Sequence, residues 1–386
     1  MELIAKTLLG LENILAEEIK AIGGQNIQVL NRAVSFEGEM EMVYKANLYL
    51  RTAISILSPI YTFHAKHENH FYKKIKDFNW EDIMGLKDTF VIKSTVNSEY
   101  FTHSHYISLK AKDAIVDQFY EKYDKRPDVN KYAPTYVFQL HITGSKCTVL
   151  LDSSGDSLYK RGYRMQAVDA PINEALAAGM ILLSGWDKKS TFIDPMCGSG
   201  TLPIEAAMIA KNIPPQINRE TFAFKNWKQY KEKDWLAIKN EATNNIKDIE
   251  FNIYGFDKEM GAVRKADINA NGIPQIEGLI QFQRKAFEKL QKPSDEGILI
   301  FNPPYDERMK LSEVDDFYAH MGDHLKNNFT GYQAWIISSN ADAIKSIGLR
   351  TSKRIVLYNG KLECRFLNYD LYKGSKKTKY ENASEA

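Results

Sequence analysis

Short apolar runs alternate with amphipathic stretches along the second half of the chain. The clearest run, at 297–301, reads Gly-Ile-Leu-Ile-Phe without a polar interruption, which is typical of a parallel strand buried on both faces. Strand and helix patterns at this spacing predict a doubly wound, Rossmann-like α/β sheet with a largely parallel core. We expect seven strands, the last two forming an antiparallel hairpin, at 190–193, 251–256, 279–282, 297–301, 334–338, 355–358 and 362–369.

Helical periodicity separates these strands. Pro171 would lie in the first turn of a helix that ends near Gly185. Residues 211–249 interrupt the alternation and read as an insertion. The other expected helices lie at 201–210, 260–271, 314–325 and 341–347.

The first half of the chain has a different pattern. Residues 1–55 follow the order β-α-β-β-α, which predicts a ferredoxin-like α+β unit. The α+β pattern continues to Asp152, and Pro59 places the strand at 56–63 at the edge of its sheet. Strands are expected at 89–96, 136–142 and 146–151, and helices at 71–75 and 108–123.

These patterns divide the chain into segments. Turn formers at 152–157 mark a boundary between the two halves. The tail is charged and polar, and we expect it to be disordered. The expected segments are a ferredoxin-like domain at 1–55, an α+β domain at 56–155, a linker at 156–170, the doubly wound domain at 171–372 and the tail at 373–386.

Composition narrows the class of protein. The 386 residues are 44% hydrophobic and 26% charged, with a net charge of +2, so a nucleic-acid surface must be a local patch. Three separated cysteines do not form a disulfide framework. No apolar run reaches the roughly 18 residues of a membrane span, and the N-terminus lacks a signal-peptide pattern. We therefore expect a cytoplasmic protein that has no membrane partner.

Two segments combine cations with aromatic residues. Lys66, Lys73 and Lys74 surround Phe71 and Tyr72, a composition that fits either an RNA contact or an amphipathic helix with solvated lysines.

The second segment, at 158–164, contains Lys160, Arg161 and Arg164 and reads either as an RNA contact or as a linker held by ion pairs. Histidines at 64, 67 and 70 have no cysteine nearby, so we interpret them as a polar surface and predict no metal site.

The chemistry is predicted where the strand at 297–301 ends. Asn302, Pro303, Pro304 and Tyr305 follow it, and proline forces the chain out of the sheet at the carboxyl edge, where open α/β sheets bind ligands. An amide oxygen, proline carbonyls and an aromatic ring suit a planar amino group. On this segment alone, the amine could belong to adenine, guanine, cytosine or glutamine.

A second segment predicts a cofactor site. Asp194 ends a strand and precedes the glycine loop at 198–200, which lacks both the full dinucleotide fingerprint and a Walker lysine. A carboxylate here repels phosphate and favours a cationic ligand such as S-adenosylmethionine. Asp257 ends the next strand, where a ribose diol is usually bound. The alternatives are a tight turn at the loop and a helix cap at Asp257.

Together these segments resemble S-adenosylmethionine-dependent methyltransferases of the Asn-Pro-Pro-Tyr class. The nearer resemblance is to THUMP-domain RNA guanine-N2 methyltransferases, in particular bacterial enzymes that modify 23S rRNA of the large subunit. The matching text lies at 150–155, 160–164, 194–201, 301–305 and 359–364.

The resemblance implies a THUMP fold for 56–155 and methyl transfer to a guanine N2 of 23S rRNA or a large-subunit precursor. It implies catalytic roles for 302–305 and an RNA-binding role for the two basic segments. One departure is Lys285, which stands where the family often has an acid near the adenine. The cofactor is expected at Asp194, Met196, Cys197, Gly198, Gly200, Thr201, Asp257 and Lys258.

Other functions remain open on the sequence. A tRNA guanine-N2 methyltransferase is the nearest alternative, and DNA adenine or protein glutamine methylation uses the same amine chemistry. A different class is a non-catalytic RNA-binding assembly factor with an inactive methyltransferase fold. The intact segments at 194–201 and 302–305 favour an enzyme.

Overall fold

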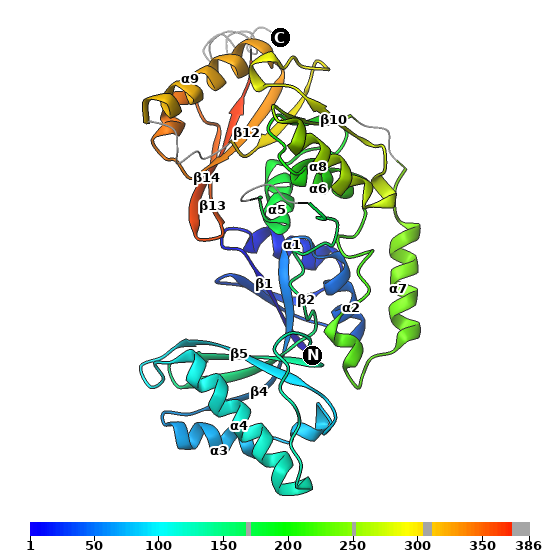
Figure 1. Cartoon of the computed structure of the whole chain (residues 1–386), viewed down its shortest axis with the longest axis vertical. Coiled ribbons are helices and arrows are strands. Elements are labelled where there is room, and N and C mark those ends of the chain that lie inside the picture. The colour runs from blue at the N-terminus through cyan, green and yellow to red at the C-terminus, as the bar shows by residue number, and fades with distance from the viewer. Residues whose placement is uncertain (167–170, 249–251, 304–310, 373–386) are drawn as a thin grey trace. The chain divides into compact units, whose positions relative to one another are not determined.

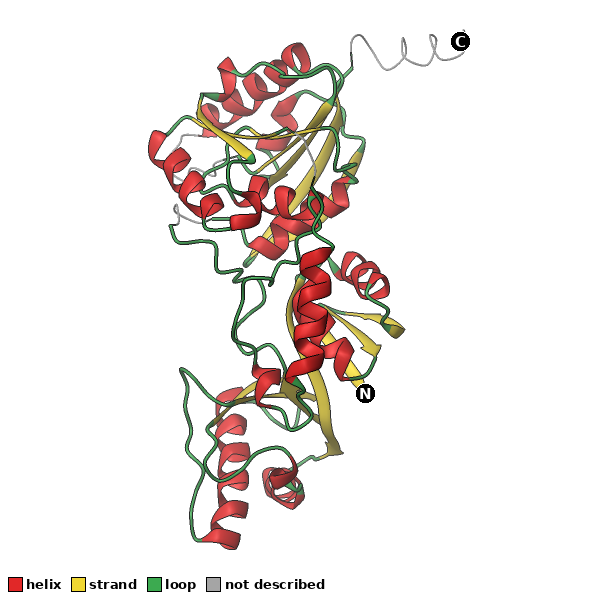
Figure 2. Cartoon of the chain, turned by 90° about the vertical axis from the view of Figure 1, so that its right-hand side faces the viewer, coloured by secondary structure: helices red, strands yellow, loops and turns green. Residues whose placement is uncertain are grey.

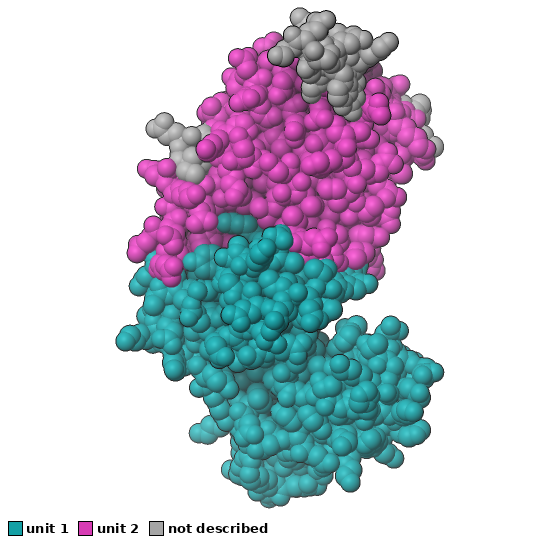
Figure 3. Space-filling model, turned by 180° about the vertical axis from the view of Figure 1, so that it is seen from behind, with its two compact units in different colours: residues 1–7, 15–158, 219–240 teal, residues 8–14, 159–218, 241–386 magenta. Residues whose placement is uncertain are grey.

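The computed structural model describes residues 1–166, 171–248, 252–303 and 311–372 (Figure 1), and Figure 2 shows their helices in red and their strands in yellow. They form two compact units, shown in Figure 3. Unit 1 contains residues 1–7, 15–158 and 219–240, and unit 2 contains 8–14, 159–218 and 241–386. The units therefore exchange two segments relative to the linear order expected from the sequence.

Unit 1 is an α+β assembly. Its strands are β1 (Glu2–Thr7), β2 (Gln25–Leu30), β3 (Ala33–Glu37), β4 (Ala53–His64), β5 (Phe90–Asn97), β6 (Tyr136–Thr143) and β7 (Lys146–Asp152). Its helices, including short 3-10 turns labelled η, are α1 (Glu12–Ala21), which begins in unit 2, α2 (Met40–Tyr49), α3 (Glu68–Asp77), η1 (Trp80–Asp82), α4 (Ser104–Tyr123), η2 (Ala223–Asn226) and most of α7 (Glu232–Asn244).

One seven-stranded sheet, sheet A, runs through both predicted N-terminal domains in the order β2-β3-β1-β4-β7-β6-β5. The 12-residue strand β4 joins the two halves because it pairs with β1 on one side and β7 on the other. The edge position predicted from Pro59 is therefore wrong. Proline is tolerated in this central strand because the register shifts between Pro59 and Tyr61, as at a β-bulge.

The insertion at 211–249 contributes its aromatic residues to unit 1. The centre of the Phe224 ring lies 5.1 Å from the centre of the Tyr44 ring on α2, and the centre of the Trp235 ring on α7 lies 6.1 Å from it. The Tyr44 hydroxyl accepts a hydrogen bond from the Lys231 backbone N–H at 2.9 Å. This aromatic cluster explains why 219–240 belongs to unit 1 although it is inserted in the sequence of unit 2.

Unit 2 has the predicted α/β alternation. Its strands are β8 (Thr191–Asp194), β9 (Ile253–Asp257), β10 (Ile280–Arg284), β11 (Gly297–Phe301), β12 (Tyr332–Ser338), β13 (Lys353–Asn359) and β14 (Leu362–Asp370). Its helices are α5 (Glu174–Ser184), α6 (Thr201–Ala210), α8 (Met260–Asn271), η3 (Pro274–Ile276), η4 (Phe287–Lys289), α9 (Leu311–Asn328) and η5 (Ala343–Ile347).

Sheet B of unit 2 has the order β10-β9-β8-β11-β12-β14-β13. The first five strands are parallel, and β13 and β14 form an antiparallel hairpin, which confirms the predicted doubly wound fold. β8 is flanked by β9, the next strand along the chain, on one side and by β11 on the other, so the strand order changes direction at β8. Ligands of open α/β sheets bind at such a change of direction.

The central strands of sheet B are buried on both faces. Leu299 and Phe301 belong to a core that includes residues of α9, while the alternate residues Ile298 and Ile300 are at most 4% exposed toward the other face. Two helices differ from the prediction. α5 begins at Glu174 after the side chain of Asn173 caps it, so Pro171 precedes the helix. The segment expected as a helix at 341–347 is the 3-10 turn η5.

No helix of the described residues is long and apolar enough to cross a membrane. The tail at 373–386, predicted to be disordered, lies outside the described residues.

Candidate active site

Three polar residues meet at the carboxyl edge of sheet B. Asp194 ends β8, Asp257 ends β9, and Asn302 directly follows β11. β8 lies between the other two strands, and Asp194 is in register with Gly255 of β9. The sheet topology thus brings together two residues predicted for the cofactor and one predicted for catalysis.

The loop between β8 and α6 has little steric freedom. The Cys197 N–H donates to the Phe256 carbonyl at 2.8 Å, and the Gly200 N–H donates to the Cys197 carbonyl at 2.8 Å. Gly200 has φ +83°, and a Cβ at this position would lie 2.9 Å from the Ala266 Cβ. Glycine is therefore needed here both for backbone conformation and for close packing against α8.

The Asp257 carboxylate fixes the same loop. Its Oδ2 accepts a hydrogen bond from the Gly198 N–H at 3.0 Å, and its Oδ1 accepts one from the Glu259 N–H at 2.9 Å. Each carboxylate oxygen retains a further acceptor site. The carboxylate is thus held in place and able to accept from a ligand hydroxyl.

Asp194 is the buried carboxylate of the site, with 2% of its surface exposed. Burial and the nearby negative charge of Asp257 raise its pKa well above the ordinary range, and a hydrogen bond from the Met196 N–H opposes them in part. Burial likewise raises the pKa of the Cys197 thiol. A positively charged group at this point would stabilise the ionised form of Asp194.

Asn302 presents an unused acceptor. Its Oδ1 is buried and has no hydrogen-bond partner among the described residues. An unpaired buried carbonyl is costly, so it needs a specific explanation, and a bound donor supplies one. Pro303 is buried next to it, whereas Pro304 and Tyr305 lie outside the described residues.

The segment at 159–166 does not place all of its cations at the surface. The Arg161 side chain is 1% exposed and its Nε lies 3.4 Å from Oε1 of Glu205, whose side chain is 0% exposed. Tyr163 donates a 3.0 Å hydrogen bond to the same carboxylate oxygen. The predicted RNA contact at Arg161 is therefore corrected: its guanidinium belongs to a buried ion pair inside unit 2. Lys160 is exposed.

Arg164 is also committed to the interior of unit 2. Its Nε lies 3.1 Å from Glu174 Oε1, and its Nη2 donates to Thr201 Oγ1 at 3.1 Å. Thr201 is the first residue of α6, directly after the glycine loop. Arg164 thus ties this segment to Glu174 and to the first residue of α6, which agrees with the alternative of a segment held by ion pairs.

Asn269 was not predicted from the sequence. It is completely buried on α8, and its Nδ2 donates to the carbonyls of Ser199 at 3.0 Å and Gln166 at 2.8 Å. Its Oδ1 accepts from the Met165 and Gln166 N–H groups, both at 3.0 Å. In the sequence, an asparagine next to the apolar stripe that includes Ala266 and Ala270 is the signal that could have indicated a buried, hydrogen-bonded side chain.

The remaining predicted residues lie on separate surfaces. Lys73 is exposed and Lys74 half-buried on α3, and the Lys66 ammonium lies 5.6 Å from the centre of the Tyr100 ring. Lys258 is exposed, and its carbonyl accepts from Arg284 Nε at 3.0 Å. Among the described residues, the histidines included, no group of three or more side chains is arranged to hold a metal.

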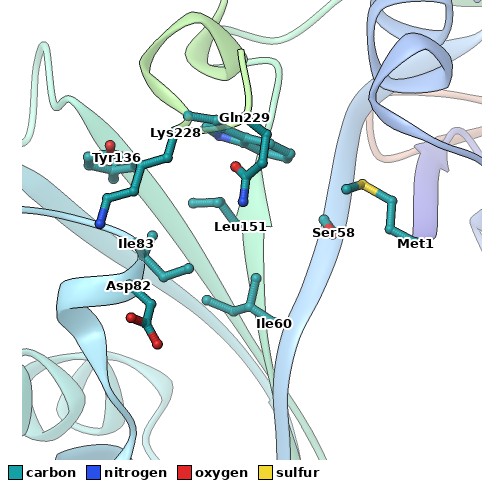
Figure 4. Close-up of a pocket in the computed structure, with 10 residues that line it drawn as sticks. Met1, Ser58, Ile60, Asp82, Ile83, Tyr136, Leu151, Lys228 and Gln229 are labelled. Atoms are coloured by element: carbon teal, nitrogen blue, oxygen red, sulfur yellow. The ribbon is translucent and has the colours of Figure 1, made fainter.

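Unit 1 contains a separate cavity of about 140 Å³, shown in Figure 4. Ile60, Ile83 and Leu151 form apolar walls, and Lys228 and Gln229 come from the inserted segment. None of the residues predicted to bind cofactor or RNA lines it.

Comparison with protein families gives three matches. Residues 161–368 match the RMKL-like methyltransferase domain, residues 2–57 the RlmL ferredoxin-like domain and residues 65–152 the THUMP domain. These matches agree with the fold predicted for each part of the chain.

Two curated relatives show the extent of the similarity. The chain is 36% identical to "Ribosomal RNA large subunit methyltransferase K/L" of Syntrophotalea carbinolica over 94% of its length and 52% of the relative's. It is 35% identical to "Putative RNA methyltransferase slr0064" of Synechocystis over 94% of this chain and 95% of that one. The chain thus spans about half the length of the K/L relative.

A solved structure matches nearly the whole chain. The crystal structure of SMU.472, "a putative methyltransferase complexed with SAH", aligns with a TM-score of 0.86 and 30% identity over 97% of this chain and 99% of that one. Unit 2 has the fold of S-adenosylmethionine-dependent methyltransferases, which confirms the cofactor predicted from the Asp194 loop.

Proposed function

The chain belongs to the RMKL-like methyltransferase family, and from that premise we propose that it transfers a methyl group from S-adenosylmethionine to the exocyclic N2 amine of a guanosine in 23S rRNA. The observation that supports this most directly is the buried Asn302 Oδ1 without a hydrogen-bond partner among the described residues. It lies at the carboxyl edge of the sheet, on the other side of β8 from Asp257. A cytoplasmic location is part of the same proposal.

The residues around β8 fit the methyl donor. Asp194 would receive a cationic group of the donor, because its buried carboxylate lacks a positive partner among the described residues. Asp257 would accept from the ribose hydroxyls while its backbone hydrogen bonds keep it oriented. When bound, S-adenosylmethionine supplies an electrophilic methyl group on a sulfonium.

Asn302 would act on the amine. Its Oδ1 and the Pro303 carbonyl would accept the two amine hydrogens, which orients the nitrogen and draws its lone pair out of conjugation with the ring. Tyr305 would stack on a base that is flipped out of the RNA. Orientation and hydrogen bonding carry such a reaction, so no strong base is required for the attack itself.

The RNA substrate is supported by the match of residues 65–152 to a THUMP domain. The relative's name, ribosomal RNA large subunit methyltransferase K/L, favours large-subunit rRNA over tRNA. Guanine N2 rests on the resemblance, since Asn302 and its neighbours suit any planar amine.

The test measures transfer of tritiated methyl groups by the purified chain to unmodified 23S rRNA, tRNA and duplex DNA. We expect label in 23S rRNA and N2-methylguanosine on mass spectrometry of its nucleosides. Label in tRNA alone would replace the substrate with tRNA, and N6-methyladenosine would replace guanine. Cofactor binding by calorimetry without transfer to any of the three would instead support a non-catalytic assembly factor.

A further inference from the structure

The strands of the THUMP half of sheet A have one polar face. Pairing places Thr95, His141, Thr148 and Thr62 side by side across β5, β6, β7 and β4. Side chains alternate between the two faces of a strand, so the residues two positions away share this face. Thr95, His141 and Thr62 are exposed, whereas Val137 and Leu150 farther along the same face are buried, so the face is open around the first three residues.

The opposite face of the same strands is the core. Phe138 and Leu140 are at most 2% exposed, and Phe63 of β4 lies 5.8 Å from Phe71 of α3. Figure 1 shows α3 and α4 together on one side of β4 and β5. Along the described strands β4–β7, the phenylalanine and tyrosine side chains are at the core-facing positions, so the rings on the open face are the imidazoles of His64 and His141.

The open face has a positive charge. Lys93 and Lys146 are exposed on it, and Lys6 of β1 reaches it with its ammonium 3.4 Å from Gln139 Oε1. Burial and the positive charges of Lys6 and Lys146 lower the pKa of His141. Asp152 is the one carboxylate in β4–β7, and it is 2% exposed with a hydrogen bond from Gln139.

The helical side of the same domain differs in its charges. Lys76 pairs with Glu121 at 2.5 Å, Lys112 pairs with Asp113 at 2.5 Å, and Lys122 pairs with Glu81. Cations already neutralised by carboxylates release fewer counterions when they meet phosphate. These three lysines of the helical side are therefore a poorer match for a polyanion than the lysines of the open face, and Lys73 and Lys74 of α3 are the cations on the helical side to compare with them.

We propose that the open face of β4–β7, with Lys6, Lys93 and Lys146, binds the phosphate backbone of a structured RNA. This rests on the proposed function, because the RNA is its substrate. Lysine, threonine and histidine side chains donate hydrogen bonds to phosphates and 2′-hydroxyls, and two imidazole rings are a smaller stacking surface for single-stranded bases than phenylalanine, tyrosine or tryptophan rings. The face thus contributes affinity without reading the sequence.

Three variants with the same charge change test the proposal. The open-face variant carries Lys6→Gln, Lys93→Gln and Lys146→Gln, and the α3 variant carries Lys66→Gln, Lys73→Gln and Lys74→Gln. The ion-paired control carries Lys76→Gln, Lys112→Gln and Lys122→Gln. Binding of each to 23S rRNA and to a 20-base-pair RNA hairpin is measured over a series of salt concentrations.

For the open-face variant, we expect the slope of log affinity against log salt concentration to be smaller in magnitude by about 2 to 3, which is near 1 for each lysine replaced. The ion-paired control should lose less than about 1. A larger loss in the α3 variant, or an unchanged slope in the open-face variant, would overturn the proposal. Stronger binding to a poly-U strand than to the hairpin would contradict backbone recognition.

A second variant and a folding check complete the design. Thr95→Glu with Thr143→Glu adds carboxylates at exposed positions of the open face and should also weaken RNA binding. Thermal unfolding and circular dichroism of each variant identify those that fail to fold. If the wild-type protein binds neither RNA, the proposed function is wrong. If the wild-type protein binds RNA and both open-face variants bind it as tightly as the wild type does, only the present proposal is wrong.

Discussion

The two seven-stranded sheets use polar residues in opposite ways. The central strands of sheet B are buried on both faces, and its candidate functional groups (Asp194, Asp257 and Asn302) lie at the carboxyl ends of adjacent strands. The THUMP half of sheet A packs one face against helices, and polar side chains of β4–β7 lie in rows on the other face. A buried polar group depends on a few specific hydrogen-bond or ion-pair partners. In an exposed row of polar side chains, each side chain contributes only part of the binding energy. Single substitutions should therefore have large effects in unit 2 and small ones on the open face.

The largest effect is expected at Arg161. Arg161→Ala leaves the completely buried Glu205 carboxylate without its ionic partner, which costs about 3–5 kcal/mol of unfolding free energy. Chemical denaturation measures this loss. The adjacent Lys160→Ala is the matched control, because Lys160 is exposed, and it should change stability little. If the two variants had the same free energy of unfolding, the expectation that buried polar groups of unit 2 tolerate substitution poorly would be wrong.

Asn302→Ala should remove the acceptor that orients the amine. We expect turnover to fall about 100- to 1,000-fold, the loss typical for one group that stabilises a transition state. Cofactor affinity, measured by calorimetry, should stay the same. Asn271→Ala, at an exposed amide at the end of α8, is the control. Loss of both turnover and cofactor binding would indicate misfolding instead.

Asn269→Ala tests a positioning role. It leaves the buried Ser199 carbonyl without its hydrogen-bond donor, so we expect a loss of about 1–3 kcal/mol in stability. Cofactor affinity should fall as well, because Ser199 belongs to the glycine loop, and RNA affinity should not. A drop in stability with unchanged cofactor affinity would make Asn269 a purely structural residue.

Cofactor binding should depend on pH through Asp194. Its pKa is raised in the free protein, so a fraction of the carboxyl is neutral at pH values above the ordinary carboxyl value of 3.8. The affinity for the ammonium-bearing product S-adenosylhomocysteine should rise with pH through that raised pKa and level off above it. Asp194→Asn should abolish the dependence. Calorimetry between pH 5 and 8 measures both, and an affinity that falls as pH rises would contradict the assignment.

The smallest effect is expected for a single change on the open face. Lys93→Gln should lower the salt slope of RNA binding by about 1 and leave turnover at saturating RNA unchanged. Filter binding over a salt series measures the slope. A complete loss of RNA binding would mean that Lys93 makes a specific contact, and sheet A would then resemble sheet B.

The sequence predicts best those elements whose residues form a local pattern of apolar and polar positions. The run at 297–301 and the polar residues after it located β11 and Asn302, because a strand buried on both faces has a distinctive apolar pattern. Pro59 misled the prediction because the β-bulge that tolerates it depends on the register of a distant strand. Arg161 misled it for a similar reason: its partner Glu205 is 44 residues away, and spacing alone does not reveal a buried ion pair.

The exchange of segments between the units has a consequence for synthesis on the ribosome. The aromatic cluster around Tyr44 includes Phe224 and Trp235, which are translated about 180 residues later. At typical rates of about 5–20 residues per second, unit 1 waits on the order of ten seconds or more for its last element. A fragment that ends near residue 158 would lack Phe224 and Trp235 and leave the Tyr44 ring uncovered, so the N-terminal half should be produced together with residues 219–240.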